Sequence, residues 1–129
     1  MDDTKLNILV VSASLYLAGH PITEVLKADW SKPKAQDDLS RFESIGFQVD
    51  PTDESTTLRN LRQKLQEKNW DGVLVGWCLR GHVEFTVLFE RIVGILVDQA
   101  KVQPDMNIMF SSGPDNLVET TVRNFPKSR

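Results

Sequence analysis

Four short runs of apolar and β-branched residues recur along this 129-residue chain, at residues 6–12, 46–50, 71–78 and 106–112. The first and third runs lack alternation between polar and apolar residues, which is typical of strands covered on both faces of a parallel sheet. Stretches with helical spacing separate the four runs. Strands that alternate with helices form a parallel sheet with crossover helices on its faces, so the sequence predicts an α/β protein.

The segments between the runs carry helical patterns. Pro21 suits the first turn of a short helix whose inward-facing residues would be Ile22, Val25 and Leu26. Intervals of three or four residues predict one face of a second helix at Ala35, Leu39, Phe42 and Ile45. The same spacing predicts a third helix through Leu58, Leu61 and Leu65.

The predicted elements define a topology. Asp53 or Ser55 would cap the helix through Leu61, and two further helices are predicted over residues 83–101 and 115–125. Right-handed crossovers and the commonest doubly wound layout give the strand order 2-1-3-4. The sequence therefore predicts a single three-layer, flavodoxin-like domain over residues 1–129.

Composition narrows the classes of function. The net charge is −3, whereas non-specific binding to nucleic acid needs a basic surface. No apolar run approaches the ~18 residues of a membrane span. The single cysteine, Cys78, excludes an intrachain disulfide, and the acidic N-terminus differs from a signal peptide. We therefore expect a cytoplasmic protein that binds neither nucleic acid nor membranes.

Topology also predicts where a site would lie. Open α/β sheets bind ligands beyond the carboxyl ends of their strands, at the point where the strand order reverses. Here that point lies between the strands at residues 6–12 and 71–78. The residues delivered to this crevice are Ser12, Ser14, Asp50, Cys78, Arg80, Gly81, His82, Ser111 and Ser112.

Arg80 follows a predicted buried strand, so its backbone would be fixed while its guanidinium reaches the crevice. Its paired N–H donors suit a carboxylate or phosphate, and the next helix would begin beside it with free N–H groups. We expect Arg80 to face the end of the first strand and to bind a small organic anion. The alternative is a structural salt bridge to Asp50, Asp71 or Asp115.

Neighbouring residues would complete this site. Ser111 and Ser112 would hold the anion from the opposite side, unless they serve only as turn and cap residues. The segment 12–21 is long for a loop, and an apolar wall for the ligand would come from its Leu15, Tyr16 and Leu17. The alternative is that residues 15–18 already belong to a helix. Gly81 is expected to supply a backbone shape that other residues resist.

Three residues, His82, His20 and Glu84, are candidates for acid–base catalysis, since imidazole and carboxyl groups transfer protons readily. His82 could instead be a solvent-exposed residue at a helix start, and Glu84 could simply complement the helix dipole. If the protein is an enzyme, we expect isomerase- or lyase-type chemistry without a cofactor.

Signatures of better-defined sites are missing. A receiver domain needs an aspartate at the end of the third strand, where Trp77 and Cys78 stand. The loop after the first strand carries leucine and tyrosine, which argues against the FMN phosphate loop of flavodoxins, and it lacks the G-x-G-x-x-G of dinucleotide folds. Two separated histidines form no metal motif. We therefore expect neither a cofactor nor a metal.

The segment DGVLVGWCLRGHVEFTVLFERIV, residues 71–93, resembles a segment of small flavodoxin-like α/β proteins. The resemblance covers this part of the chain only and rests on Gly76, Arg80, Glu84, Thr86, Phe89 and Glu90. It implies the same fold and marks Arg80, but it implies no activity.

The helix predicted over residues 83–101 is apolar over a wider arc than one sheet needs. The excess could pack on neighbouring helices, or it could form a surface for self-association. Strand four would also be an edge strand with no fifth strand to cover it. We therefore expect a homodimer that forms through this helix or the strand-four edge. A non-enzymatic interaction module of this kind is the alternative to a domain that binds a small organic anion.

Overall fold

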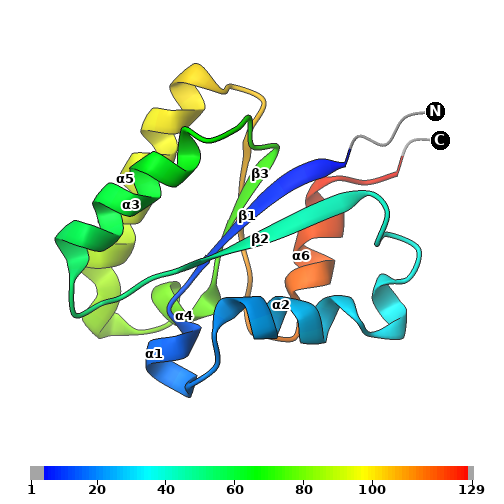
Figure 1. The fold of residues 1–129 in the computed structure, drawn as a ribbon, viewed down its shortest axis with the longest axis horizontal. Helices are drawn as coiled ribbons and strands as arrows, with labels where there is room; N and C mark the ends of the chain where they lie inside the picture. The colour runs from blue at the N-terminus through cyan, green and yellow to red at the C-terminus, as the bar shows by residue number, and fades with distance from the viewer. Residues whose placement is uncertain (1–4, 128–129) are drawn as a thin grey trace.

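The structure, a computed structural model, describes residues 5–127 (Figure 1). Its strands are β1 (Leu6–Ser12), β2 (Phe42–Gln48), β3 (Gly72–Val75) and β4 (Asn107–Phe110). Its α-helices are α1 (Ser14–Ala18), α2 (Ile22–Trp30), α3 (Glu54–Leu65), α4 (Trp77–Arg80), α5 (Thr86–Val102) and α6 (Leu117–Asn124). The 3-10 helices of this part of the chain are η1 (Pro33–Ala35) and η2 (Val83–Phe85).

The four strands form one all-parallel sheet in the order β2-β1-β3-β4, which confirms the predicted α/β fold and strand order. β1 lies inside the sheet, where Leu9 pairs with Ile45 of β2 and with Val73 of β3. Helices α3 and α5 cover one face and α2 and α6 cover the other, so the molecule has three layers (Figure 1).

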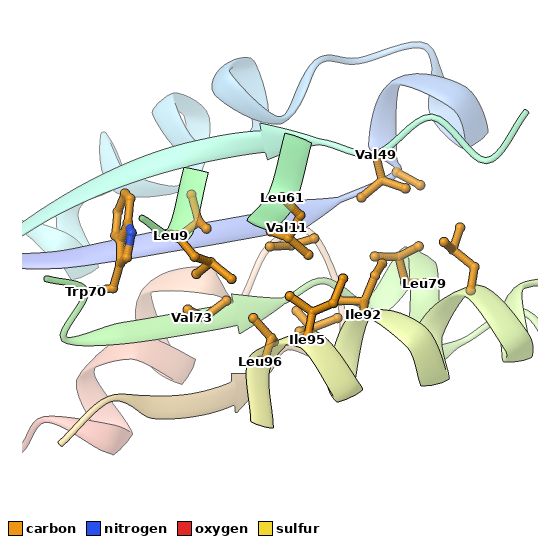
Figure 2. Close-up of a cluster of buried hydrophobic side chains, with 14 of the residues drawn as sticks. Leu9, Val11, Val49, Leu61, Trp70, Val73, Leu79, Ile92, Ile95 and Leu96 are labelled. Atoms are coloured by element: carbon orange, nitrogen blue, oxygen red, sulfur yellow. The ribbon is translucent and has the colours of Figure 1, made fainter. Parts of the chain in front are cut away.

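Residues of β1 alternate between two hydrophobic cores. Leu9 and Val11 face α3 and α5, in a cluster that includes Val49, Leu61, Trp70, Val73, Leu79, Ile92, Ile95 and Leu96 (Figure 2). Ile8 and Val10 face α2 and α6, in a cluster that includes Ile22, Leu26, Phe42, Leu74, Met109 and Leu117. Each such buried side chain contributes about 1.5–3 kcal/mol to folding. Burial on both faces explains why this strand lacks polar alternation.

The helix predicted through Ala35, Leu39, Phe42 and Ile45 is wrong. Only η1 is helical there, and β2 begins at Phe42, four positions before the predicted start of the strand. The spacing of three between Phe42 and Ile45 also fits a strand that is buried on both faces. In a strand, residues an odd number of positions apart point to opposite faces, so both side chains can be buried. Phe42 packs between Trp30 and Phe125, with ring centroids 5.8 Å from each, while Ile45 packs in the opposite core.

β3 is half as long as predicted, because it ends at Val75 and α4 begins at Trp77. Gly76 lies between them and its N–H donates to the carbonyl of Val11. A Cβ on Gly76 would lie 3.2 Å from the side chain of Ser12, so the glycine lets the chain cross close to β1 before it turns. Arg80 therefore sits on a helical turn and not at the end of an extended strand.

A buried aspartate joins the layer of α2 and α6. Asp29 is 1% exposed, and its Oδ2 accepts a hydrogen bond of 3.0 Å from the N–H of Val118 in the first turn of α6. Its Oδ1 lies 2.9 Å from Nζ of Lys34 and 3.1 Å from Nζ of Lys32. Burial alone would raise the pKa of Asp29, but the Val118 N–H and the two ammonium groups outweigh it and lower the pKa.

Candidate functional site

The space between the carboxyl ends of β1 and β3 is almost filled. A cavity of about 20 Å³ remains there, and it is lined by residues that include Ser12, Ser14, Gly76, Cys78 and Ser111. The Oγ of Ser12 accepts from the N–H of Ser14 at 3.1 Å, and the buried Oγ of Ser14 has no hydrogen-bond partner in the part of the chain that the structure describes. A cavity of this size is large enough for about one water molecule. A larger ligand would therefore have to lie on the rim, above α1 and α4.

Arg80 lies on this rim and is exposed. Its Nη2 donates a hydrogen bond of 3.0 Å to the carbonyl oxygen of Ser111, just after β4. The guanidinium is therefore turned toward the end of β4, whereas the sequence predicted that it would face the end of β1. The salt bridge that was the alternative is not formed, since no carboxylate among residues 5–127 pairs with Arg80. Its other N–H donors remain available to a ligand.

Four rings form a row, and two of them, Trp77 and His82, flank Arg80 in the chain. The ring centroids of Tyr16 and Phe85 are 6.1 Å apart, those of Phe85 and His82 are 6.0 Å apart, and those of His82 and Trp77 are 5.1 Å apart. Tyr16 and Trp77, at the two ends, are 55% and 39% exposed. These rings come from α1, α4 and the segment around η2, so the row crosses the ends of β1 and β3. We call these four residues and Arg80 the aromatic rim.

Short local elements place the rim residues. The chain after β1 forms α1, as the alternative prediction had it, and Gly19 ends this helix in the left-handed conformation with φ 76°. Leu15 and Tyr16 remain exposed on α1. Gly81 has an ordinary helical conformation, so the expectation of an unusual backbone is wrong. Its lack of a side chain matters instead because a Cβ would lie 2.7 Å from Nε1 of Trp77.

His82 is half-buried in the rim, and its Nδ1 lies 2.9 Å from the carbonyl oxygen of Cys78. A carbonyl only accepts hydrogen bonds, so Nδ1 carries a proton, and in the neutral form of the ring the lone pair lies on Nε2. The thiol of Cys78 is different. Burial raises the pKa of Cys78, against a smaller lowering by a hydrogen bond with Ser12, so the group remains a thiol at neutral pH.

Of the other predicted site residues, His20 and Asp50 lie apart from the rim, whereas Glu84 directly precedes Phe85 in the chain. His20 lines a separate hollow of about 380 Å³ together with residues of α2 and Pro114. Its Nδ1 lies 3.9 Å from Oε1 of Glu24. Glu84 is exposed on η2. Asp50 lies beside α3, where its Oδ1 accepts from the N–H and the hydroxyl of Thr52.

Ser111 and Ser112 both form hydrogen bonds within the protein, Ser111 across the sheet and Ser112 within its own turn. The Oγ of Ser111 accepts from the N–H of Trp77 at 3.2 Å, which joins the ends of β3 and β4. The Oγ of Ser112 accepts from Nδ2 of Asn116 at 2.6 Å, and the N–H groups of Ser112 and Gly113 donate to Oδ1 of the same residue. For Ser112 this is the turn chemistry that was the alternative, whereas Ser111 bonds to the first residue of α4.

Sequence reasoning missed Trp77 and Phe85 as members of the site. Trp77 was assigned to a buried strand because an apolar run precedes it. The signal that could have placed it is Gly76, since a glycine within a strand pattern often marks a tight bend or a close approach of another backbone. Phe85 was assigned to a long helix, whereas the 3-10 turn at η2 presents it to Tyr16.

A metal site and a membrane-spanning helix are both absent from residues 5–127. Within residues 5–127, no group of three or more His, Cys, Asp or Glu side chains is placed to hold a metal ion. The same residues contain no helix that is both long and apolar enough to span a membrane. Comparison of the chain with protein-family models, with curated proteins and with solved structures finds no match.

Proposed function

We propose that this protein binds a small organic anion with a flat ring at the aromatic rim. The observation that supports the proposal is an arginine that pairs with no carboxylate among residues 5–127, flanked in the chain by two members of a row of rings whose end members, Tyr16 and Trp77, are exposed, at the point where the strand order reverses. Arg80 would hold a carboxylate or phosphate, and Tyr16 and Trp77 would contact the flat part of the ligand.

The same geometry supports acid–base chemistry on such a ligand. Because the carbonyl of Cys78 holds Nδ1 of His82 protonated, Nε2 is the atom that would accept a proton from a bound molecule. His82 packs against Trp77 and Phe85, so a ligand stacked on the rim would lie next to its ring. In an isomerisation, Nε2 of His82 would remove a proton from one atom of the ligand and return it to a neighbouring atom.

Binding can be tested with benzoate and its uncharged analogue benzamide, by following the indole N–H resonance of Trp77 in NMR spectra. A charge-assisted hydrogen bond contributes about 1.5–3 kcal/mol, so Arg80→Gln should weaken benzoate binding roughly tenfold to hundredfold. Arg123→Gln, on the exposed side of α6, is the matched control and should change nothing. Equal affinity for benzamide, or unchanged binding by Arg80→Gln, would refute the proposal.

A second candidate function is homodimerisation through the outer side of α5. Leu88 and Leu96 face the core, at 1% and 0% exposure, so they cannot form such a surface. The exposed apolar residues on this side are Val87, Val97 and Val102. A charged residue at Val97 should then reduce the mass measured by light scattering from that of a dimer to that of a monomer. A wild-type protein that is already monomeric at high concentration would rule this function out.

A further inference from the structure

Strand β2 is an outer strand, and its far edge pairs with no other strand among residues 5–127. The N–H of Leu6 donates to the carbonyl of Arg41, and the N–H of Val49 donates to the carbonyl of Ser12. In a parallel ladder, successive residues of a strand turn their N–H and C=O groups to opposite sides. Odd-numbered residues of β2 therefore face β1, and the outward backbone groups belong to Phe42, Ser44, Gly46 and Gln48.

This edge lacks the usual protection against pairing. Natural edge strands are blocked by lysine, proline, bulges or shortness. β2 has seven residues, and none of its outward residues is lysine or proline. The opposite edge of the sheet, on β4, is shorter. The N–H groups of Asn107 and Ser111 donate to the carbonyls of Asp71 and Val75, so odd-numbered residues of β4 face β3. Only Ile108 and Phe110 of β4 therefore turn their backbone groups outward. The edge predicted to need cover was that of β4, but β2 offers the longer template.

A hollow lies on each side of this edge. One, of about 520 Å³, is lined by the second half of β2 and by α3. The other, of about 710 Å³, is lined by β2 and α2. Gly46 lines both, so the two hollows meet at the middle of the strand. A strand added to β2 would point alternate side chains into the two hollows, because side chains along a strand alternate between faces.

The two hollows differ in chemistry. The hollow beside α3 is lined by the acids Asp50, Asp53 and Glu67 and by one base, Lys64. Lys64 is paired with Glu67 at 3.3 Å, so the net negative charge of this hollow comes from Asp50 and Asp53. The hydrogen bonds of Asp50 to Thr52 lower the pKa of Asp50, so this carboxylate stays charged at neutral pH. Apolar residues of the hollow beside α2 are Leu26, Trp30, Leu39 and Phe42.

We propose that the outer edge of β2 binds an extended peptide segment in which basic and apolar residues alternate, as a fifth strand of the sheet. The outward backbone groups of Ser44 and Gly46 would pair with the segment. Its basic side chains would meet Asp50 and Asp53 beside α3, and its apolar side chains would meet Trp30 and Leu39 beside α2. This site is separate from the aromatic rim and does not depend on the function proposed there.

Charge favours such a segment over a second copy of the chain. Antiparallel pairing of two β2 strands about a twofold axis would set Ser44 opposite Gly46. The axis would be perpendicular to the sheet, so the α3 side of one copy would adjoin the α3 side of the other. The acidic hollow, with charge −2 from Asp50, Asp53, Glu67 and Lys64, would then adjoin its own copy. On the other face Lys5 and Lys27, with charge +2, would also meet their own copies. Like charges placed side by side disfavour that pairing.

The test uses three capped seven-residue peptides, matched to the length of β2. One alternates lysine and valine, one alternates glutamate and valine, and one has the lysines and valines in separate blocks. The alternating lysine peptide should bind and slow hydrogen exchange at the amides of Ser44 and Gly46. Ser44→Pro removes an outward N–H without touching the bonds to β1, so it should weaken binding at least about tenfold.

A second variant keeps the test valid if Ser44→Pro does not fold. Asp50→Asn combined with Asp53→Asn removes the two charges but keeps the oxygens that bind Thr52 and cap α3. It should weaken binding of the lysine peptide, whereas the matched double variant Asp98→Asn with Asp105→Asn should not. Equal binding of the glutamate or block peptide, or no protection at Ser44, would overturn the proposal. A dimer that Ser44→Pro dissociates would assign the edge to a second copy instead.

Discussion

Asp29 should be the most important charged residue for stability, and Asp29→Ala tests this. The carboxylate is 1% exposed and accepts from the N–H of Val118 at 3.0 Å, so it caps α6 from a different part of the chain. Alanine would remove this acceptor and leave a buried N–H without a partner. It would also remove the pairing with Lys34, which keeps Glu119 at 2.9 Å as a second partner.

The magnitude follows from these contacts. A hydrogen bond to a charged group contributes about 1.5–3 kcal/mol, and a partly exposed ion pair up to about 1 kcal/mol. Asp29→Ala should therefore cost about 3 kcal/mol of unfolding free energy. Asp29→Asn keeps an oxygen for Val118 and should cost about half as much. Because the pKa of Asp29 is lowered from 3.8 in the folded state, this contribution is present above that pH and is lost as the pH falls below it.

Urea unfolding at pH 7 measures both costs, with Asp37→Ala as the control because Asp37 is an exposed aspartate. The difference between Asp29→Ala and wild type should also shrink when the same titration is repeated at pH 3. If Asp29→Ala is within about 0.5 kcal/mol of the exposed control, which is the usual range for surface substitutions, then the buried carboxylate is not a stabilising cap and the reasoning fails.

Three further outcomes can be measured. Gly46→Ala would place a Cβ 2.7 Å from an α2 side chain and should lower the free energy of unfolding by about 1–3 kcal/mol. In α5, the added Cβ of Gly94→Ala would meet no atom within 4 Å and should raise the free energy of unfolding by about 0.5–1 kcal/mol. The urea midpoints of the two variants should move in opposite directions, and midpoints that do not would contradict this reasoning. Gly81→Ala should displace the indole of Trp77 and shift the tryptophan emission to longer wavelength, which an unchanged spectrum would exclude. Because burial raises the pKa of Cys78, iodoacetamide should label the folded protein more slowly than the urea-unfolded protein at pH 7.5, and equal rates would show that the thiol is not protected.

The parallel sheet could be predicted because the apolar runs of β1 and β3 are buried on both faces, which leaves a clear sequence pattern. The strand order then followed from right-handed crossovers and the commonest doubly wound layout. The start of β2 could not, because Phe42 and Ile45 fit a helix by spacing and a strand by alternation. The contacts that decide between them are the rings of Trp30 and Phe125, which are distant in sequence. Local periodicity carries no information about such partners.

The candidate site was predictable in place but not in shape. Arg80 was placed at the end of the third strand because polar residues follow an apolar run there. Its direction depends on Gly76, which ends β3 early, and on Ser111, which binds both Arg80 and the N–H of Trp77. The pairing of the rings of Tyr16 and Phe85 needs two short helical turns from separate parts of the chain.

The cap that Asp29 provides for α6 also bears on the order in which the protein can fold during synthesis. The aspartate and Val118 are 89 positions apart, so α2 leaves the ribosome long before the N–H that its carboxylate binds. Until residues beyond Leu117 emerge, the α2 side of the sheet lacks its second helix, and Ile8, Val10 and Leu74 are incompletely covered. The nascent chain is therefore expected to hold its α3 and α5 layer first and to be most exposed to chaperones on the opposite face.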